Sequence, residues 1–219
     1  MPGEINKTNC KSLIEYAGQT MLGHLLDSLV AGGITNFVIT TNPHSDLDVR
    51  NVVARKNLKS ELVKNSTNGF RQIPFTVKGY LYDRFLFVCG HHPLSVDFVK
   101  EIVRESEKYE CIITAYDNTQ YPYNNIRMVL DNKSLAVKID LANDQKVKKD
   151  CVYLRNPYII NKHIVYETNK HNYKKTFSLF LLDYWRSGGS LGVVHASMPP
   201  EFDYDSEFAK TQSFLNSIS

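Results

Sequence analysis

The sequence predicts an α/β protein in which helices cover both faces of a mostly parallel sheet, with an antiparallel hairpin inserted late in the chain. Short apolar runs rich in β-branched residues alternate with helical patterns over the first half of the sequence. Strand–helix–strand units of this kind form parallel sheets with right-handed connections. A turn signal between two strand-like segments then predicts the hairpin. The expected fold is therefore a three-layer α/β/α, Rossmann-like architecture.

The first half of the chain supplies the expected parallel sheet. Thr20 is placed to cap a helix with apolar residues at helical spacing, which Gly32 and Gly33 end. Pro74 interrupts the pattern between residues 69 and 83. The remaining expected elements of this half are strands at 37–41, 62–63, 85–89 and 111–116, and helices from Ser45 or Asp46 toward Asn57 and over 95–108. We expect strands 37–41, 85–89 and 111–116 to be neighbours in one largely parallel sheet.

The pattern changes after Tyr121. Asp131-Asn132-Lys133 lies between segments 125–130 and 135–139, which predicts the hairpin. Two short strand-like runs, 151–154 and 158–160, bracket Pro157. The last elements expected are an amphipathic helix over 176–186, closed by Gly188 and Gly189, a strand at 191–195 and a terminal helix from Ser206.

Composition sets the general class. The chain has 219 residues, of which 42% are hydrophobic and 22% charged, as in a globular protein, and we expect one domain over 1–219. A net charge of +3 with scattered basic residues argues against a nucleic-acid partner. Apolar runs fall short of the roughly 20 residues that span a bilayer, which argues against a membrane partner. The four cysteines are far apart, which argues against a zinc knuckle or disulfide scaffold and for a cytoplasmic protein. The sequence leaves a homo-oligomer open.

Ligands of open α/β sheets bind beyond the carboxyl ends of the strands. Three segments therefore compete for the site: the turn after Thr41, the turn Gly90-His91-His92, and the loop that leads to Asp203 and Asp205.

Three stretches carry recognisable motifs. Residues 11–22, KSLIEYAGQTML, are similar to K-P-L-I-x-x-x-G-x-P-M-L, with Lys11 on the lysine and Ser12 in place of the proline. Residues 85–94, FLFVCGHHPL, are similar to F-L-V-x-x-G-D-x-P-L, and residues 202–206, FDYDS, to the start of W-x-D-I-D-T-P-E-D-L. In this order and spacing the chain resembles the nucleotidyltransferase superfamily, which includes sugar-phosphate nucleotidyltransferases, choline-phosphate cytidylyltransferases and molybdenum-cofactor guanylyltransferases.

The resemblance implies a GT-A-like fold, a nucleoside triphosphate and a phosphorylated small-molecule acceptor as partners, and Mg²⁺ as cofactor. It implies that the acceptor attacks the α-phosphorus and that pyrophosphate leaves. Lys11 would stabilise phosphate charge, Gly69, Gly90 and His91 would lie at the nucleotide, and Asp203 with Asp205 would hold the metal. The residues alone allow plainer roles: Lys11 as a surface lysine, Asp205 as a helix cap, and one of His91 and His92 bonded to backbone.

Two departures from the family pattern bear on activity. His91 stands where the family has the aspartate that holds Mg²⁺, and imidazole is a poor ligand for a hard cation. The sequence also begins about where the family's first strand and glycine-rich loop, A-G-G-x-G-T-R-M, end, so we expect residues 1–219 to lack that phosphate cradle. Both departures favour the rival hypothesis of a catalytically impaired binding or regulatory protein. A glycosyltransferase of related fold ranks last, because Asp203-x-Asp205 lies near the carboxyl terminus and not after a central strand.

Overall fold

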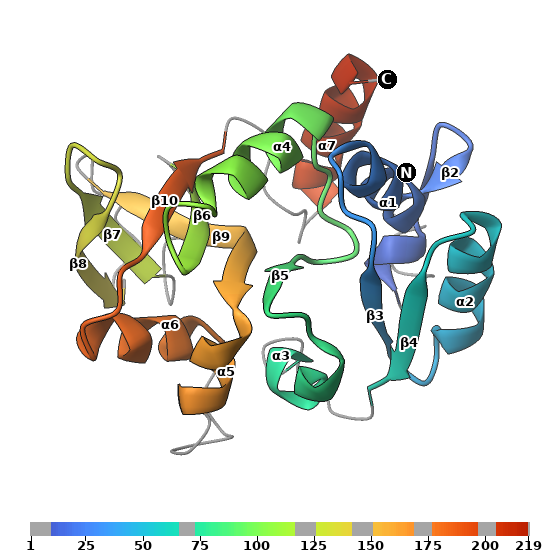
Figure 1. Ribbon diagram of the computed structural model, residues 1–219. Helices are drawn as coiled ribbons and strands as arrows, with labels where there is room; N and C mark the ends of the chain where they lie inside the picture. Colours follow the sequence, from blue (N-terminus) through green and yellow to red (C-terminus); the bar gives the residue numbers. More distant parts are fainter. Residues whose placement is uncertain are drawn as a thin grey trace. The chain divides into compact units, whose positions relative to one another are not determined.

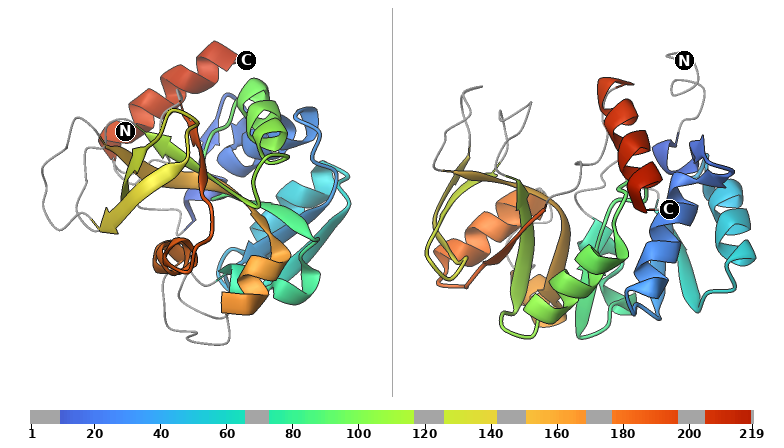
Figure 2. Two further views of the ribbon diagram at one scale, coloured as in Figure 1. Left: turned by 60° about the vertical axis from the view of Figure 1, so that its left-hand side comes forward. Right: turned by 90° about the horizontal axis from the view of Figure 1, so that it is seen from above.

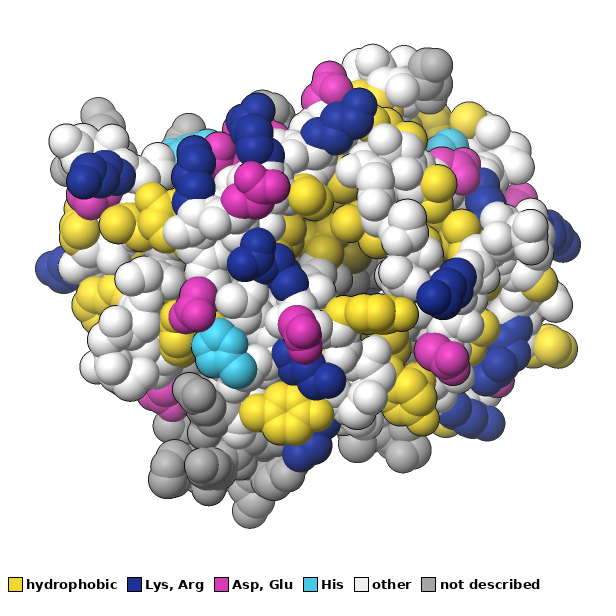
Figure 3. Space-filling view, viewed as in Figure 1, with side chains coloured by type: hydrophobic (Ala, Val, Ile, Leu, Met, Phe, Trp, Pro, Cys, Tyr) yellow, Lys and Arg dark blue, Asp and Glu magenta, His cyan; other side chains and the backbone are white. Residues whose placement is uncertain are grey.

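The computed structural model describes residues 10–65, 73–116, 126–141, 151–168, 177–196 and 205–218 (Figure 1). The chain divides into two compact units. The first unit comprises Met1–Asn68, Val88–Glu101 and Met198–Ser219, and the second comprises Gly69–Phe87 and Ile102–Ser197. The single domain expected over 1–219 stays a prediction. Lys and Arg are intermixed with Asp and Glu on the face shown in Figure 3.

The first unit is built from short elements. They are η1 (Lys11–Leu13), β1 (Glu15–Tyr16), β2 (Gln19–Thr20), α1 (Met21–Ala31), β3 (Phe37–Thr41), α2 (Asp46–Arg55), β4 (Ser60–Lys64), the first part of α4 (Val96–Glu105) and α7 (Asp205–Ile218). β1 and β2 form an antiparallel hairpin, and β3 pairs with β4 in parallel. α2 packs against both β4 and α1. The expected helices at 21–31 and from Asp46, and the strand at 37–41, are confirmed.

Local chemistry explains where these elements begin and end. The side-chain oxygen of Thr20 accepts a hydrogen bond from the Gly23 amide at 3.1 Å, which caps α1. α1 is followed by Gly33 in the left-handed region, with φ of 100°. Ala17 and Gly18 both have positive φ at the tip of the β1–β2 hairpin, as the favoured two-residue turn requires. The Ser95 hydroxyl accepts from the Phe98 amide and caps α4, which ends three residues before Lys108.

The second unit is built around a six-stranded sheet. Its strands are β5 (Arg84–Phe87), β6 (Cys111–Tyr116), β7 (Ile126–Leu130), β8 (Ala136–Leu141), β9 (Val152–Asn161) and β10 (Gly192–His195). Its helices are α3 (Ile73–Thr76), η3 (Lys78–Tyr80), α5 (Lys162–Thr168), α6 (Phe177–Arg186) and the end of α4. The strand order is β10-β6-β9-β7-β8, and β5 also pairs with β9. β10 and β6 are parallel, and the other pairs are antiparallel.

The expected pairing of three strands is corrected. β5 and β6 both pair antiparallel with β9, so they point the same way in one sheet but with β9 between them. β3 pairs with β4 in a separate two-stranded sheet. The prediction assumed that strands joined by a helix are neighbours in the sheet. It therefore did not allow β9, from late in the chain, to lie between β5 and β6. The α/β class is confirmed, with parallel pairs and an antiparallel hairpin of β7 and β8.

The two runs around Pro157 are one strand and not two. The register between β6 and β9 shifts, so that Ile113 pairs with Tyr158 but Thr114 pairs with Arg155. Two residues of β9, one of them Pro157, are left without a place in the ladder, which is where a proline is tolerated. The Thr114 hydroxyl donates to the Pro157 carbonyl at 2.8 Å and holds the bulge.

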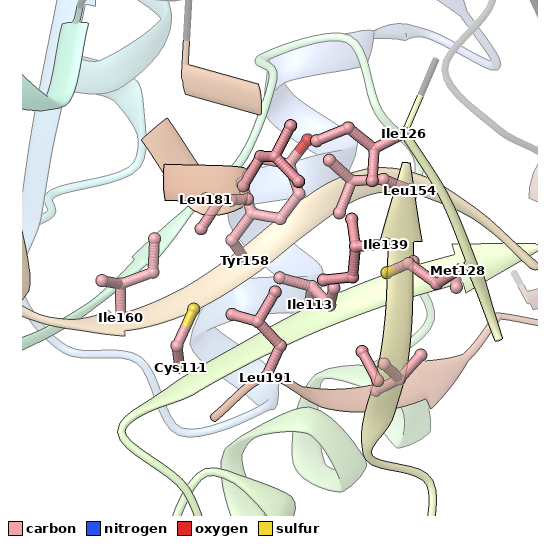
Figure 4. Close-up of a cluster of buried hydrophobic side chains, with 14 of the residues drawn as sticks. Cys111, Ile113, Ile126, Met128, Ile139, Leu154, Tyr158, Ile160, Leu181 and Leu191 are labelled. Carbon is pink, nitrogen blue, oxygen red and sulfur yellow. The ribbon is translucent and has the colours of Figure 1, made fainter. Parts of the chain in front are cut away.

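One core of the second unit lies on this sheet and under α5 and α6 (Figure 4). Ile113, Met128 and Ile160 are fully buried there, and Tyr158 stacks on Phe87 with ring centroids 6.1 Å apart. Burial also raises the pKa of the Cys111 thiol, which keeps it protonated and unreactive. None of the four cysteines forms a disulfide. Within the described ranges, no helix has the length and apolar character needed to cross a membrane.

Candidate functional site

The first motif, the turn of the second motif and the helix that follows the third motif belong to the first unit, whereas Phe85–Phe87 of the second motif belong to the second unit. η1 carries the first motif, residues 88–94 carry the turn of the second, and α7 begins within the third, at Asp205. Gly69 and Asp203 lie outside the described residues, as does the side chain of Asp205. Lys11, Gly90 and His91 can therefore be placed, while the proposed roles of all six residues stay predictions.

The first motif forms a tight turn that leads into α1. The Cys10 carbonyl accepts from the Leu13 amide at 3.0 Å, and the Lys11 carbonyl accepts from the Ile14 amide at 3.2 Å. The Ile14 carbonyl in turn accepts from the Met21 amide at 2.9 Å, which fixes η1 against the start of α1. Lys11 is half-buried in this turn. Its backbone is therefore held at both ends by short-range hydrogen bonds.

The second motif approaches the first through a glycine. A Cβ atom built on Gly90 would lie 3.2 Å from the Cβ of Ser12 and 3.7 Å from both Ser12 Oγ and Leu22 Cδ1. A side chain at position 90 would therefore require Ser12 to move by a few tenths of an ångström, which glycine avoids. Two segments that are 78 positions apart in the sequence therefore lie close together in the structure.

The histidines of the second motif differ in their surroundings. The His92 amide donates to the Cys89 carbonyl at 3.0 Å, which closes the turn, and the His92 side chain is 1% exposed. His91 is half-buried. The two adjacent histidines therefore differ in exposure.

The third motif's helix packs against the elements of the first. Leu215 of α7 is buried with Met21 of α1, and the Tyr16 hydroxyl donates to the side-chain oxygen of Asn216 at 2.5 Å. Figures 1 and 2 both show α7 beside α1. The helix that Asp205 begins is thus anchored to β1 and α1.

The turn after Thr41 is closed by its own side chains. The Asn42 side-chain oxygen accepts from the amides of His44 and Ser45 at 2.9 and 2.8 Å, and the Thr41 hydroxyl donates to Asp46. The hydrogen bond from Arg50, followed by that from Thr41, lowers the pKa of the Asp46 carboxyl. These groups build the start of α2, so of the three competing segments this one has a clear structural role.

A hollow of about 240 Å³ lies between α1, the segment after the Gly90 turn and α7. Its lining includes His24, Asp27, Leu94, Val96, Leu215 and Ile218. Two polar groups here have partners: a His24 ring nitrogen lies 2.8 Å from the Tyr16 carbonyl, and Asp27 lies 2.7 Å from the Lys56 ammonium. The hollow touches the second motif at Leu94 but is lined by neither Lys11 nor Gly90.

Ser12 is the residue of this site that reasoning from sequence missed. Its Cβ is the atom nearest to the place that a Cβ on Gly90 would take, at 3.2 Å, and its hydroxyl lies 2.9 Å from the Cys10 thiol. The signal was available, because Ser12 replaces a proline of the motif next to the candidate lysine. No group of three or more histidine, cysteine, aspartate or glutamate side chains gathers as a metal site within the part of the chain that the structure describes.

Comparisons with known proteins bear on the fold of the chain. No protein-family model and no curated protein matches the sequence. Among solved structures, the inositol-1-phosphate CTP transferase from T. maritima is similar with a TM-score of 0.75 and 14% identity, over 95% of this chain and 86% of that one. A CMP:2-keto-3-deoxy-manno-octonic acid synthetase complexed with CTP is similar with a TM-score of 0.74 and 13% identity, over 94% and 92%.

A third solved structure is the 4-diphosphocytidyl-2C-methyl-D-erythritol synthase from Anaerococcus prevotii. Its TM-score is 0.68 at 15% identity, over 94% of this chain and 93% of that one. Similarity at this level of identity, over nearly the whole length of each chain, is similarity of fold. The chain therefore has the fold of the nucleotidyltransferase superfamily.

Proposed function

We propose that this chain transfers a cytidine monophosphate group from CTP to a phosphorylated small molecule and releases pyrophosphate. The observation that carries the proposal is the contact between Gly90 and Ser12 in a chain of this fold, because it joins the two motifs implied at the nucleotide. The choice of CTP follows from the similar structures, whose names include a CTP transferase and a synthetase complexed with CTP.

In the proposed reaction an oxygen of the acceptor attacks the α-phosphorus of CTP. The bond from that phosphorus to the bridging oxygen breaks, and pyrophosphate leaves with the electron pair. Such a transfer needs in-line positioning and neutralisation of charge more than acid–base groups. The Lys11 ammonium stabilises the charge that develops at the α-phosphate. Gly69 and Gly90 let the backbone approach the nucleotide, and His91 lies next to it.

Mg²⁺, when bound, would neutralise charge on the triphosphate. Mg²⁺ prefers oxygen ligands, so Asp203 and Asp205 are the residues that we propose to hold it. The anchoring of α7 to β1 and α1 supports this, because Asp205 begins that helix.

The test is pyrophosphate release from each of the four common nucleoside triphosphates. Inositol 1-phosphate, a polyol phosphate and a hexose 1-phosphate serve as acceptors, with unphosphorylated inositol as the negative control. We expect release with CTP and at least one phosphorylated acceptor. Replacing Lys11→Ala should lower kcat about a hundredfold, whereas Lys59→Ala, an exposed lysine of the same unit, should have no effect. Release that does not depend on Lys11 would contradict the assigned role.

The second candidate is a binding or regulatory protein that keeps the fold without turnover. His91 in place of a carboxylate favours it. In this case calorimetry would detect CTP binding while no acceptor releases pyrophosphate. A His91→Asp variant that gains release would show an impaired enzyme, and one that stays silent would favour a binding protein.

A further inference from the structure

Ser12 is the side chain that separates the Lys11 turn from the Gly90 turn. The Cβ of Ser12 lies 3.2 Å from the place of a Cβ on Gly90, and its Oγ lies 3.7 Å from that place. A separation of 3.2 Å is tighter than nine in ten real Cβ contacts. A single methyl group on Gly90 would therefore displace Ser12 by a few tenths of an ångström.

The position of Ser12 is itself fixed. Its hydroxyl lies 2.9 Å from the Cys10 thiol, and the hydrogen bonds from Leu13 and Ile14 hold the backbone on both sides of it. Any displacement of the Ser12 Cβ therefore moves the backbone of η1, which includes Lys11.

We propose that Ser12 is a positioning residue that sets the place of Lys11 relative to the Gly90 turn. The proposal rests on the proposed function, in which Lys11 and Gly90 meet one nucleotide. Ser12 acts through its size. Its Cβ lies between the two turns, and a larger side chain at position 12 would move them apart. A misplacement of about 1 Å in such a site costs on the order of a hundredfold in rate.

The first test changes the size of the side chain. Ser12→Ala keeps the Cβ and should keep kcat within about threefold of the unchanged protein. Ser12→Val replaces the hydroxyl with a methyl group and adds a second methyl group at Cβ, which enlarges the side chain. It should lower kcat tenfold or more, with little change in the KM for CTP, because positioning of a charge that acts in the transition state affects turnover. Circular dichroism at the assay temperature gives the folded fraction of each variant. An unchanged kcat in Ser12→Val, or an equal loss in Ser12→Ala, would overturn the proposal.

The second test is a double-mutant cycle. Gly90→Ala alone should lower kcat at least tenfold, and adding Ser12→Gly should restore at least half of the loss on a logarithmic scale, because it removes the Cβ that the new methyl group meets. Gly79→Ala, which adds a Cβ into open space, is the matched control. Two losses that simply add would show that Gly90→Ala acts by another route and would overturn the proposal.

Failure of the proposed function has a different signature. The unchanged protein would then release no pyrophosphate with any nucleotide and acceptor. The same cycle is in that case followed by thermal unfolding, where Ser12→Gly should relieve the lowered Tm of Gly90→Ala. Relief without activity would keep the contact and reject the function, and additive shifts in Tm would reject the contact as well.

Discussion

Each of the two units of this chain has its own kind of internal packing. In the first, apolar residues of short helices, such as Leu25 of α1, Val53 of α2 and Val99 of α4, are buried, and its two sheets have two strands each. In the second, one long strand, β9, pairs with β5, β6 and β7, and a continuous core covers the sheet. The start of β8 also meets the start of β10 through the pair Leu135 and Gly192.

The candidate site residues and the core on the six-stranded sheet lie in different units. The candidate residues Lys11, Gly90, His91 and Asp205 all belong to the first unit. In the proposed function a small shift of one turn would misplace them. Large buried side chains of the second unit contribute free energy of folding through their contacts. Substitutions at the candidate site residues should therefore affect turnover most, whereas substitutions of buried core residues in either unit should affect stability most.

The largest effect is expected at the proposed metal ligands. Asp203→Asn keeps the shape of the side chain and removes a charge, so pyrophosphate release should fall about a hundredfold or more. Asp97→Asn, on the exposed side of α4, is the control and should be silent. His91→Asp adds an oxygen ligand and should leave release unchanged or raise it. A silent Asp203→Asn together with an inactive His91→Asp would rule out the proposed mechanism.

The next effect tests whether the two units unfold separately. Ile113 in the second unit is fully buried, and Leu25 in the first is 2% exposed. Replacement of either by alanine should cost about 2–5 kcal/mol in urea unfolding. Hydrogen exchange should then rise in β6 and β9 for Ile113→Ala and in α1 for Leu25→Ala. An equal rise throughout the chain for both variants would contradict separate unfolding and support the single domain predicted over 1–219.

A smaller loss is expected from overpacking the second unit. A Cβ on Gly192 would lie 2.4 Å from Tyr109 Cδ2 and 2.6 Å from Ile112 Cδ1. Gly192→Ala should therefore destabilise the protein by about 1–3 kcal/mol in urea unfolding. Gly79→Ala meets nothing within 4 Å and should change the free energy of unfolding little. Equal effects of the two substitutions would show that the sheet adjusts around Gly192.

Much of the local structure could be predicted from the sequence, because it depends on neighbouring residues. Thr20 caps α1, and Asp131 accepts hydrogen bonds from the amides of Lys133 and Leu135, at 2.8 and 2.9 Å, in the expected hairpin turn. Strand pairing could not be predicted in the same way, because β9 is inserted between β5 and β6 from a distant part of the sequence. Pro157 was misread for the same reason: the bulge that accommodates it depends on Thr114.

The candidate site shows the same division. The motifs predicted which segments matter, and the structure shows that η1, the Gly90 turn and α7 belong to one unit. The contact between Ser12 and Gly90 could not be predicted, because it depends on backbone geometry across 78 positions. Gly69 and Asp203 lie outside the described residues, so their roles stay predictions.

An effect of about 1 kcal/mol is expected at the start of α1. Thr20→Ala removes the acceptor for the Gly23 amide, and loss of such a cap typically costs this much in thermal or urea unfolding. Thr20→Ser keeps the hydroxyl and should retain most of the stability. If Thr20→Ser is as unstable as Thr20→Ala, the methyl group of the threonine and not its hydrogen bond stabilises the helix.

The smallest effect concerns Asp46 at the start of α2, and it is read from its dependence on pH. Hydrogen bonds from Arg50 and Thr41 lower the pKa of this carboxyl below its value of about 3.9 in an unfolded chain. A lowered pKa in the folded state stabilises the protein above the unfolded pKa, and the contribution disappears as pH falls through the folded pKa.

Asp46→Asn should therefore lower Tm slightly at pH 7, and the difference from the unchanged protein should shrink below about pH 4. Added salt should also reduce the difference, because Arg50 is largely exposed. Asp48→Asn, an exposed carboxylate in the same turn, controls for the loss of negative charge near a helix amino terminus. A difference in Tm that stays constant from pH 7 to pH 3 would show that the charge of Asp46 does not contribute, and that the first unit is held here by shape alone.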